Sequence, residues 1–265
     1  KIWDVSDVTA EITHTFAEPV KQVAFDPAQA RSLVTLSDRF KVVLWDTSDP
    51  AHPAAPQALE GHFHPVVGFA YSPDGQTVVT YDDEGGVRLW AVSDPARPKP
   101  EGGFGTGLEI TAAALSDDRR TLALGTAKGE VRLYDLGHGP EPVELWTGKA
   151  HRGAVEALGF HHGGDALATV GKQDKVALWD VSDPRRPVEH GRINGPTEGV
   201  YAVGFGATWT TVVTSKSNGT TRSWEFDLDR AKQEMCAEVT THISREEWQQ
   251  YVGAVGALAY QRPCG

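Results

Sequence analysis

The sequence predicts an all-β fold in which small four-stranded sheets repeat around an axis as the blades of a propeller. The first observation is an internal repeat, because an aromatic residue, usually followed by an acidic one, recurs every 42 to 45 residues. The second is a pair of apolar runs that recur in phase with that aromatic. A helical solenoid would need a period of about 3.6 residues, which is absent, so a radial repeat of sheets is favoured. The recurring aromatics are Trp3, Trp45, Trp90, Tyr134, Trp179 and Trp224.

Each repeat is predicted to contain three inner strands and one outer strand. The run that ends at the aromatic, such as GVRLW, alternates apolar and other residues, as a strand with one buried face does. Two runs before it, such as VVGFAYSPDG and TVVTYDD, supply the other inner strands, and Asn218-Gly219 suits a tight hairpin. A Ser-Asp-Pro link follows several of the aromatics. Its prolines are tolerated beside an edge strand, so we expect the next strand to be outermost.

The repeats suggest a domain boundary near residue 225. Lys1 to Val5 and Glu11 to Phe16 are expected to be the third and fourth strands of a partial first blade, and five complete-looking repeats follow. Residues 1–225 are thus predicted to form an N-terminally incomplete propeller, and residues 226–265 a separate C-terminal segment.

The segment from Gly61-His62 through SPDGQTVVTYDDEGGVRLW resembles a WD40 repeat, and the aromatics in register extend the resemblance over about residues 1 to 225. The resemblance implies a WD40-type β-propeller, most often a ring of seven blades, of which this chain would be a part. In that family a histidine, a serine or threonine, an aspartate and the tryptophan of a blade form a hydrogen-bonded set. The residues that we expect to have structural roles are Trp45, Trp90, Tyr134, Trp179, Trp224, His62, His151 and Trp248.

This hydrogen-bonded set is expected to be mostly missing here. Only His62 and His151 occupy the histidine position, and the residue six before the aromatic, where the aspartate is expected, is never an aspartate in the five later repeats. Apolar packing and backbone hydrogen bonds should therefore hold the blades together. The residues at that position are Arg39, Glu84, Lys128, Gln173 and Asn218.

The C-terminal segment is predicted to form a short helical cap. From Ala231 to Val239 an apolar residue recurs every four positions, as on one stripe of an amphipathic helix. Ser244 and Glu247 form a capping box for a second short helix. The alternative is that Val255 to Tyr260 is the first strand of another repeat, but the strand that should link it to Lys1 to Val5 would then be missing, so we prefer the cap.

The C-terminal segment also resembles the closing segment of actinobacterial WD40 proteins, through Asp229-Arg230-Ala231 with Cys236, Glu246 to Tyr251, and Tyr260 to Cys264. Many such proteins carry an N-terminal signalling module, namely a STAND-type ATPase, a kinase, or a caspase-like or trypsin-like protease. The resemblance implies such a module upstream. Cys236 and Cys264 could either form a disulfide or stay reduced and buried.

The charge and hydropathy of the chain argue against several classes of partner. The 265 residues have a formal net charge of −11, so the surface should repel the phosphates of nucleic acids and of anionic membranes. No apolar run is long enough to span a bilayer, and no charged-then-apolar leader begins the sequence. Two cysteines are too few for a disulfide framework. These features favour a cytoplasmic protein.

The sequence points to no catalytic, metal or cofactor site. His161-His162 is expected to be a polar turn, since neighbouring histidines at a strand end point apart and no third ligand is suitably spaced. Asp82-Asp83-Glu84 is expected to be a solvated hairpin tip, since it lacks the oxygen ligands of a calcium loop. The glycine-rich residues 101–107 lack the helix and the Lys-Ser/Thr of a phosphate loop. We expect them to replace the Gly-His loop that leads into their blade.

We therefore expect a non-catalytic interaction scaffold or sensor that binds protein partners, which could include an upstream domain of the same polypeptide. Its contacts should come from the loops that lead into the blades, with Phe63 and Arg152 the leading candidates, because aromatics and arginines dominate interface energetics. The alternative is a propeller hydrolase with its site at the channel mouth, which the scattered histidines and carboxylates do not favour. The candidate contact residues are Glu18, Phe63, His64, Leu108, Arg152, Gly153, Glu198 and Gly199.

Amide hydrogen exchange tests the helical cap. We expect slow exchange across residues 230–252, because short polar helices persist only when tertiary contacts bury one of their faces. Fast exchange there, with strong protection at residues 255–260 alone, would favour the additional strand instead.

Overall fold

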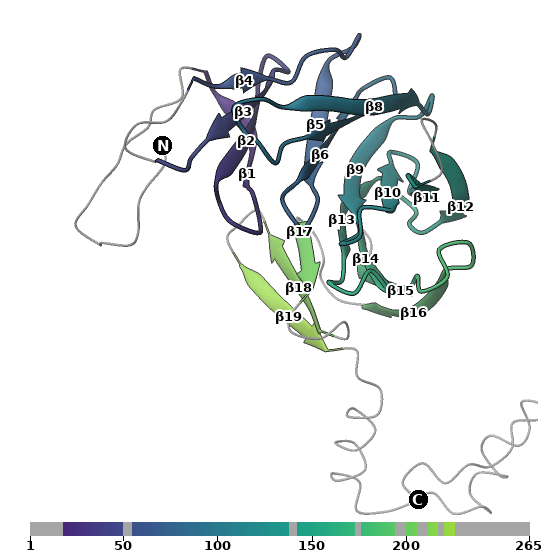
Figure 1. The fold of residues 1–265 in the computed structure, drawn as a ribbon. Coiled ribbons are helices and arrows are strands. Elements are labelled where there is room, and N and C mark those ends of the chain that lie inside the picture. Colours follow the sequence, from purple (N-terminus) through teal and green to yellow (C-terminus); the bar gives the residue numbers. More distant parts are fainter. Residues whose placement is uncertain are drawn as a thin grey trace, which may run out of the picture. The chain divides into compact units, whose positions relative to one another are not determined.

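In the computed structural model, every regular element of the described residues is a β-strand (Figure 1). The structure describes residues 18–49, 55–137, 142–172, 176–193, 200–205, 211–216 and 220–225. Five antiparallel sheets, arranged as the blades of a propeller, take up these residues in chain order. The predicted all-β propeller is therefore confirmed.

The blades are numbered along the chain. Blade 1 contains β1 (Val20–Phe25), β2 (Ser32–Ser37), β3 (Val42–Asp46) and β4 (Gln57–Ala58). Blade 2 contains β5 (Val66–Tyr71), β6 (Thr77–Asp82), β7 (Gly86–Ala91) and β8 (Lys99–Gly105). Blade 3 contains β9 (Ile110–Leu115), β10 (Thr121–Thr126), β11 (Glu130–Asp135) and β12 (Val143–Lys149). Blade 4 contains β13 (Val155–Phe160), β14 (Ala166–Gly171), β15 (Val176–Asp180) and β16 (Val188–Ile193). The described strands of blade 5 are β17 (Val200–Phe205), β18 (Thr211–Lys216) and β19 (Thr221–Glu225).

Each of the first four blades has the predicted plan of three inner strands and one outer strand. The strands pair in chain order, so β4, β8, β12 and β16 are sheet edges. Blades 2 to 5 contact one another chiefly through their first strands, as β5 does with β9 and β9 with β13, whereas blade 1 contacts β5 through β2. The proline-containing links precede these edge strands, where a missing backbone N–H does not interrupt a ladder.

The apolar core lies between the blades rather than within them. Val78 and Val79 are neighbours on β6, yet Val78 belongs to a cluster with blade 1 and Val79 to a cluster with blade 3, and both are fully buried. On β10, Leu122 and Ala123 face blades 2 and 4 in the same manner. Because both faces of these middle strands are covered, their sequences read as nearly continuous apolar runs.

The first blade presents an open apolar face. In blade 2, Phe69 on β5 and Trp90 on β7 pack against blade 1 and are 3% and 4% exposed. Val23 occupies the position of Phe69 on β1, and it is 55% exposed, while Phe25 beside it is 47% exposed. The face of blade 1 that corresponds to the covered face of blade 2 is therefore open to solvent.

The glycine-rich residues 101–107 differ from the expected loop. Glu101 to Gly105 belong to the outer strand β8, which pairs with β7 from Gly86↔Gly105 to Ala91↔Lys99. The expectation of a loop was wrong for these residues because β7 offers them an antiparallel partner, with one irregularity at Glu101. Thr106 then starts the loop proper, and its hydroxyl donates to the carbonyl of Gly85 at 2.9 Å.

Several sequence predictions concern residues outside the described ranges. These are the two strands expected in residues 1–16, the loop residues Glu198 and Gly199, and the whole C-terminal cap with Trp248, Cys236 and Cys264. They stay predictions.

Replacing Trp90 by alanine should destabilise the protein much more than replacing Asp46. Trp90 is buried between two blades, and such a truncation costs about 3–5 kcal/mol. Asp46 is half-buried and bonds only the nearby turn at Ser48, so its loss should cost about 1 kcal/mol or less. Denaturant midpoints of the two variants check this, and comparable losses would contradict it.

Candidate functional site on the second blade

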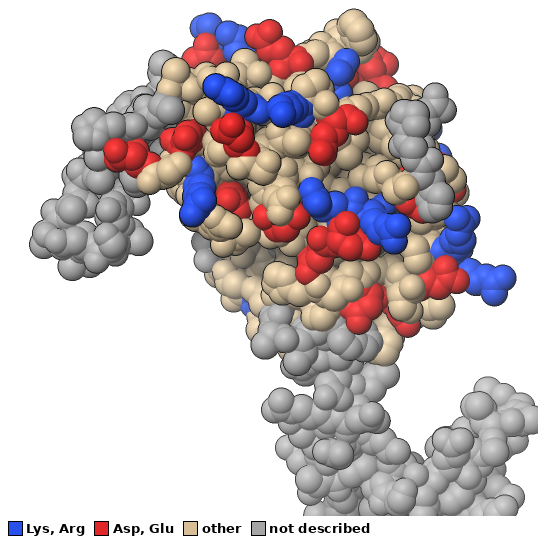
Figure 2. Space-filling view, viewed as in Figure 1, with Lys and Arg blue, Asp and Glu red and all other residues tan. Residues whose placement is uncertain are grey.

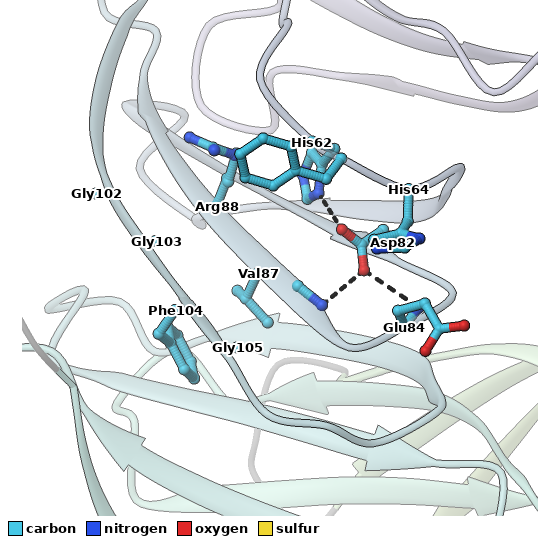
Figure 3. Close-up of a pocket in the computed structure, with 12 residues that line it drawn as sticks. His62, His64, Asp82, Glu84, Val87, Arg88, Gly102, Gly103, Phe104 and Gly105 are labelled. Atoms are coloured by element: carbon cyan, nitrogen blue, oxygen red, sulfur yellow. Dashed lines mark hydrogen bonds and ion pairs between the residues drawn. The ribbon is translucent and has the colours of Figure 1, made fainter.

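His62, on the loop that leads into blade 2, is held between two buried side chains of β6. Its Nδ1 lies 2.7 Å from Oδ2 of Asp82, and its Nε2 lies 2.7 Å from Oγ1 of Thr80 (Figure 3 shows the pair with Asp82). The indole Nε1 of Trp90 donates to the same hydroxyl of Thr80 at 2.9 Å. A neutral His62 that carries its proton on Nδ1 satisfies all three hydrogen bonds. Its Nδ1 then donates to the carboxylate of Asp82, and the hydroxyl of Thr80 donates to Nε2.

A hydroxyl, a histidine and an aspartate have the composition of an acid–base relay, but here they are closed off from solvent. The side chains of His62 and Asp82 are 5% and 4% exposed, and Thr80 is fully buried. The pKa of His62 is lowered, because burial and, to a smaller extent, the charge of Arg88 together outweigh the hydrogen bond and the charge of Asp82. The arrangement is suited to fixing the lead-in loop on the blade.

Asp82 corrects two of the sequence expectations. It stands eight residues before Trp90 rather than six, and it is buried rather than part of a solvated hairpin tip. Its Oδ1 accepts hydrogen bonds from the backbone N–H groups of Glu84 at 3.2 Å and Gly86 at 2.6 Å. The buried carboxylate of Asp82 thus holds the turn between β6 and β7 through backbone hydrogen bonds. The side chains of Asp83 and Glu84 face solvent.

Parts of the same hydrogen-bonded set recur in other blades. In blade 1 the indole of Trp45 donates to Thr35 at 2.9 Å. In blade 4 the indole of Trp179 donates to Thr169 at 3.2 Å, and Nε2 of His151 lies 2.8 Å from that hydroxyl. The expectation that apolar packing and backbone bonds replace the set is therefore wrong for blade 2 and only partly right for blades 1 and 4.

The hydrogen-bonded set is incomplete in blades 3 and 4 because each blade has a different residue type at one position of the set. Gly171 takes the place of the aspartate in blade 4, where a Cβ would lie 2.5 Å from the ring of His151. In blade 3, Leu124 stands at the threonine position and cannot accept a hydrogen bond. The hydroxyl of Tyr134 in that blade donates to Glu144 instead, at 3.2 Å.

The lead-in loop of blade 2 presents Phe63 and His64 to solvent directly after the anchored His62. Phe63 is 92% exposed, the highest value among the large apolar side chains of the described residues. A cavity of about 480 Å³ adjoins it (Figure 3), lined by Phe63, His64, Arg88 and the glycine-rich part of β8. A rigid turn, an aromatic and a cavity thus come together at this point of the blade.

The other candidate contact residues are spread over different blades. Glu18 is half-buried, pairs with Arg39 at 3.4 Å and lines a separate cavity of about 250 Å³ on blade 1. Leu108 and Gly153 are half-buried in the loops that lead into blades 3 and 4, and Arg152 is exposed. Among the described candidates, the two from the lead-in loop of blade 2 share one cavity.

Arg88 and the glycine-rich strand were missed by the sequence reasoning. A signal for Arg88 was available, because it stands two residues before Trp90 and therefore on the same face of β7. The glycines opposite it could not be foreseen, since their position depends on the register between β7 and β8.

Residues 55–91, which contain the complete polar set of blade 2, match the family described as WD domain, G-beta repeat. This segment is therefore similar to a WD40 repeat. WD40 propellers generally act as scaffolds for protein interactions, and the other blades follow the plan of this one.

A curated protein is similar to the chain over a limited range. The chain is 36% identical over 84 residues to dynein axonemal assembly factor 10 of Chlamydomonas reinhardtii. The match covers 29% of this chain and 23% of the relative, so the chain spans less than a quarter of that protein.

No helix in the described part of the chain is long and apolar enough to cross a membrane. Nor do three or more histidine, cysteine or acidic side chains gather there as metal ligands would. His161 and His162 follow β13 in a turn, as expected, where Nδ1 of His161 lies 2.9 Å from Oδ1 of Asp165.

Acidification should remove the stability that His62 contributes. Its pKa in the folded protein lies below the ordinary value of 6.5, so the unfolded chain takes up that proton first. The contribution is therefore present above about pH 6.5 and is lost as the pH falls toward the folded pKa. Free energies of unfolding should show the difference between wild type and His62→Gln shrinking from about pH 7 to about pH 5. A difference that grows instead would mean that Asp82 holds the imidazolium.

Proposed function

We propose that this chain is a non-catalytic scaffold or sensor module that binds a protein partner through the lead-in-loop surface of blade 2. The observation that supports this most is Phe63, an aromatic side chain that is 92% exposed on a loop anchored by the buried His62. Covering such a ring removes apolar surface from water. Because the loop is already fixed, little further ordering opposes binding.

The chemistry of the neighbouring groups favours binding over hydrolysis. A propeller hydrolase needs an acid–base pair that a substrate can reach. In the described residues, the His62–Asp82 pair has the right composition, but both side chains are buried and already bonded, to Thr80 and to the turn at Gly86. This supports a role for the pair in holding the contact surface.

We further propose that the module works in the cytoplasm as the C-terminal part of a larger bacterial signalling or defence protein. The resemblance of the C-terminal segment to the closing segment of actinobacterial WD40 proteins supports this setting. The open face of blade 1, with Val23 and Phe25 exposed, supports a further blade or domain of the same polypeptide as one of the partners, since it would bury apolar surface there.

Replacing Phe63 by alanine should abolish partner binding without unfolding the propeller. Truncating an aromatic at the centre of an interface weakens binding by about thirtyfold or more, whereas an exposed side chain adds little to folding stability. The measurement is affinity capture from the source cells with the full polypeptide as bait, followed by titration with the recovered partner.

Val188→Ala is a matched control, because Val188 is also an exposed apolar residue, at 61%, but lies on the outer strand of blade 4. We expect the same proteins to be captured by wild type and Val188→Ala and to be lost from Phe63→Ala. Equal capture by all three baits would refute the proposal.

A further inference from the structure

Arg88 extends from β7 over the outer strand β8. It pairs in register with Gly103, where an added Cβ would lie 3.1 Å from Cγ of Arg88. A Cβ on Gly61 of the lead-in loop would lie 3.2 Å from the guanidinium carbon. Two glycines thus leave room for this side chain, which lies near His62 in the close-up (Figure 3).

Arg88 has no hydrogen-bond or ion-pair partner among the described residues. The side chain is half-buried, and a guanidinium has five N–H donors in a planar fork. Donors that are partly withdrawn from water and left without a partner favour an anionic ligand.

Arg132 of blade 3 has carboxylate partners that Arg88 of blade 2 lacks. It stands at the same position of blade 3, where its guanidinium is paired with Glu144 at 2.9 Å and with Glu130 at 3.3 Å. In blade 2 a proline and a glycine stand at the two corresponding positions. The fold thus pairs Arg132 with two carboxylates of its own blade and leaves Arg88 without one.

The cavity of about 480 Å³ beside Arg88 is lined on one side by the glycine-rich part of β8. Its floor on β8 is glycine-rich, and nothing lies within 4 Å of a Cβ placed at Gly102 or Gly105. A ligand backbone can therefore approach closely. Phe63 forms an apolar wall, and β8 is the edge of its sheet.

We propose that this cavity binds an extended segment of a partner protein through an internal glutamate or aspartate, whose carboxylate pairs with Arg88 while a neighbouring apolar side chain packs on Phe63. The proposal rests on the proposed interaction role and adds the chemistry of the partner. It implies a fork of two parallel hydrogen bonds between guanidinium and carboxylate.

The charges around the cavity favour a single carboxylate over a phosphate. Asp82 and Glu84 also line it, the whole chain has a net charge of −11, and acidic side chains are spread over the face shown in Figure 2. A doubly charged phosphate would meet more repulsion there than a carboxylate would. Gly102 and Gly105 leave open space on either side of Gly103 and Phe104, which suits a residue within a chain rather than a chain terminus.

Binding of the full chain to arrays of randomised peptides, with acetylated and amidated ends, tests the proposal. One array has glutamate fixed at the centre, a second has glutamine there, a third has phosphoserine, and a fourth has a free C-terminal carboxylate. We expect wild type to bind the best glutamate peptides about tenfold more tightly than their glutamine counterparts. Arg88→Gln should lose this preference, and Arg88→Lys should keep part of it because the charge remains.

Arg132→Gln is the matched control, and it should keep the preference for glutamate. Thermal melts of each variant report whether it is folded. No discrimination between glutamate and glutamine by wild type, or equal discrimination by Arg88→Gln, would overturn the proposal. So would a preference for the phosphoserine or free-terminus array. Partner capture that depends on Phe63 but not on Arg88 would reject this inference and leave the interaction role standing.

Discussion

Burial of apolar side chains between neighbouring blades is the interaction on which the rest of this structure depends. A blade has no core of its own, because the middle strand exposes apolar side chains on both faces and each face is covered only by the next blade. Val78 and Val79 on one strand contribute to two different clusters. The hydrophobic gain from such shared layers fixes the inner strands, and the loops between them are then positioned by a rigid frame.

The buried polar set of blade 2 fixes the orientation of the lead-in loop on that apolar frame. Apolar contacts are not directional, whereas the bonds from His62 to Asp82 and Thr80 require one orientation of the lead-in loop. A buried histidine or aspartate without its partner would be costly, so the loop is held where both are satisfied. Phe63 gains a defined position from this arrangement, although its own side chain touches mainly solvent.

Repetition also shows how one position can take different roles in different blades. Arg132 closes an ion-pair network within blade 3, whereas Arg88 stands at the same point of blade 2 beside glycines and a cavity. The strands pair in the same way in both blades, but Gly86 and Pro100 stand in blade 2 where Glu130 and Glu144 stand in blade 3. A repeat protein can therefore acquire a binding surface on one blade by removing internal partners from a residue that another blade uses for stability.

The sequence by itself determined the number and order of strands in the described blades and most of the apolar side chains that the inner strands bury. Both follow from local periodicity, since alternation and turn chemistry act over a few residues. Tertiary structure decided which polar groups meet. Asp82 was expected in a solvated turn, because its burial depends on a histidine 20 residues away along the chain. The strand formed by Glu101 to Gly105 and the place of Arg88 above it depend on the register with β7. The hydrophobic pattern normally specifies register, but the glycines of β8 carry no apolar side chains that would mark which residue pairs with Arg88.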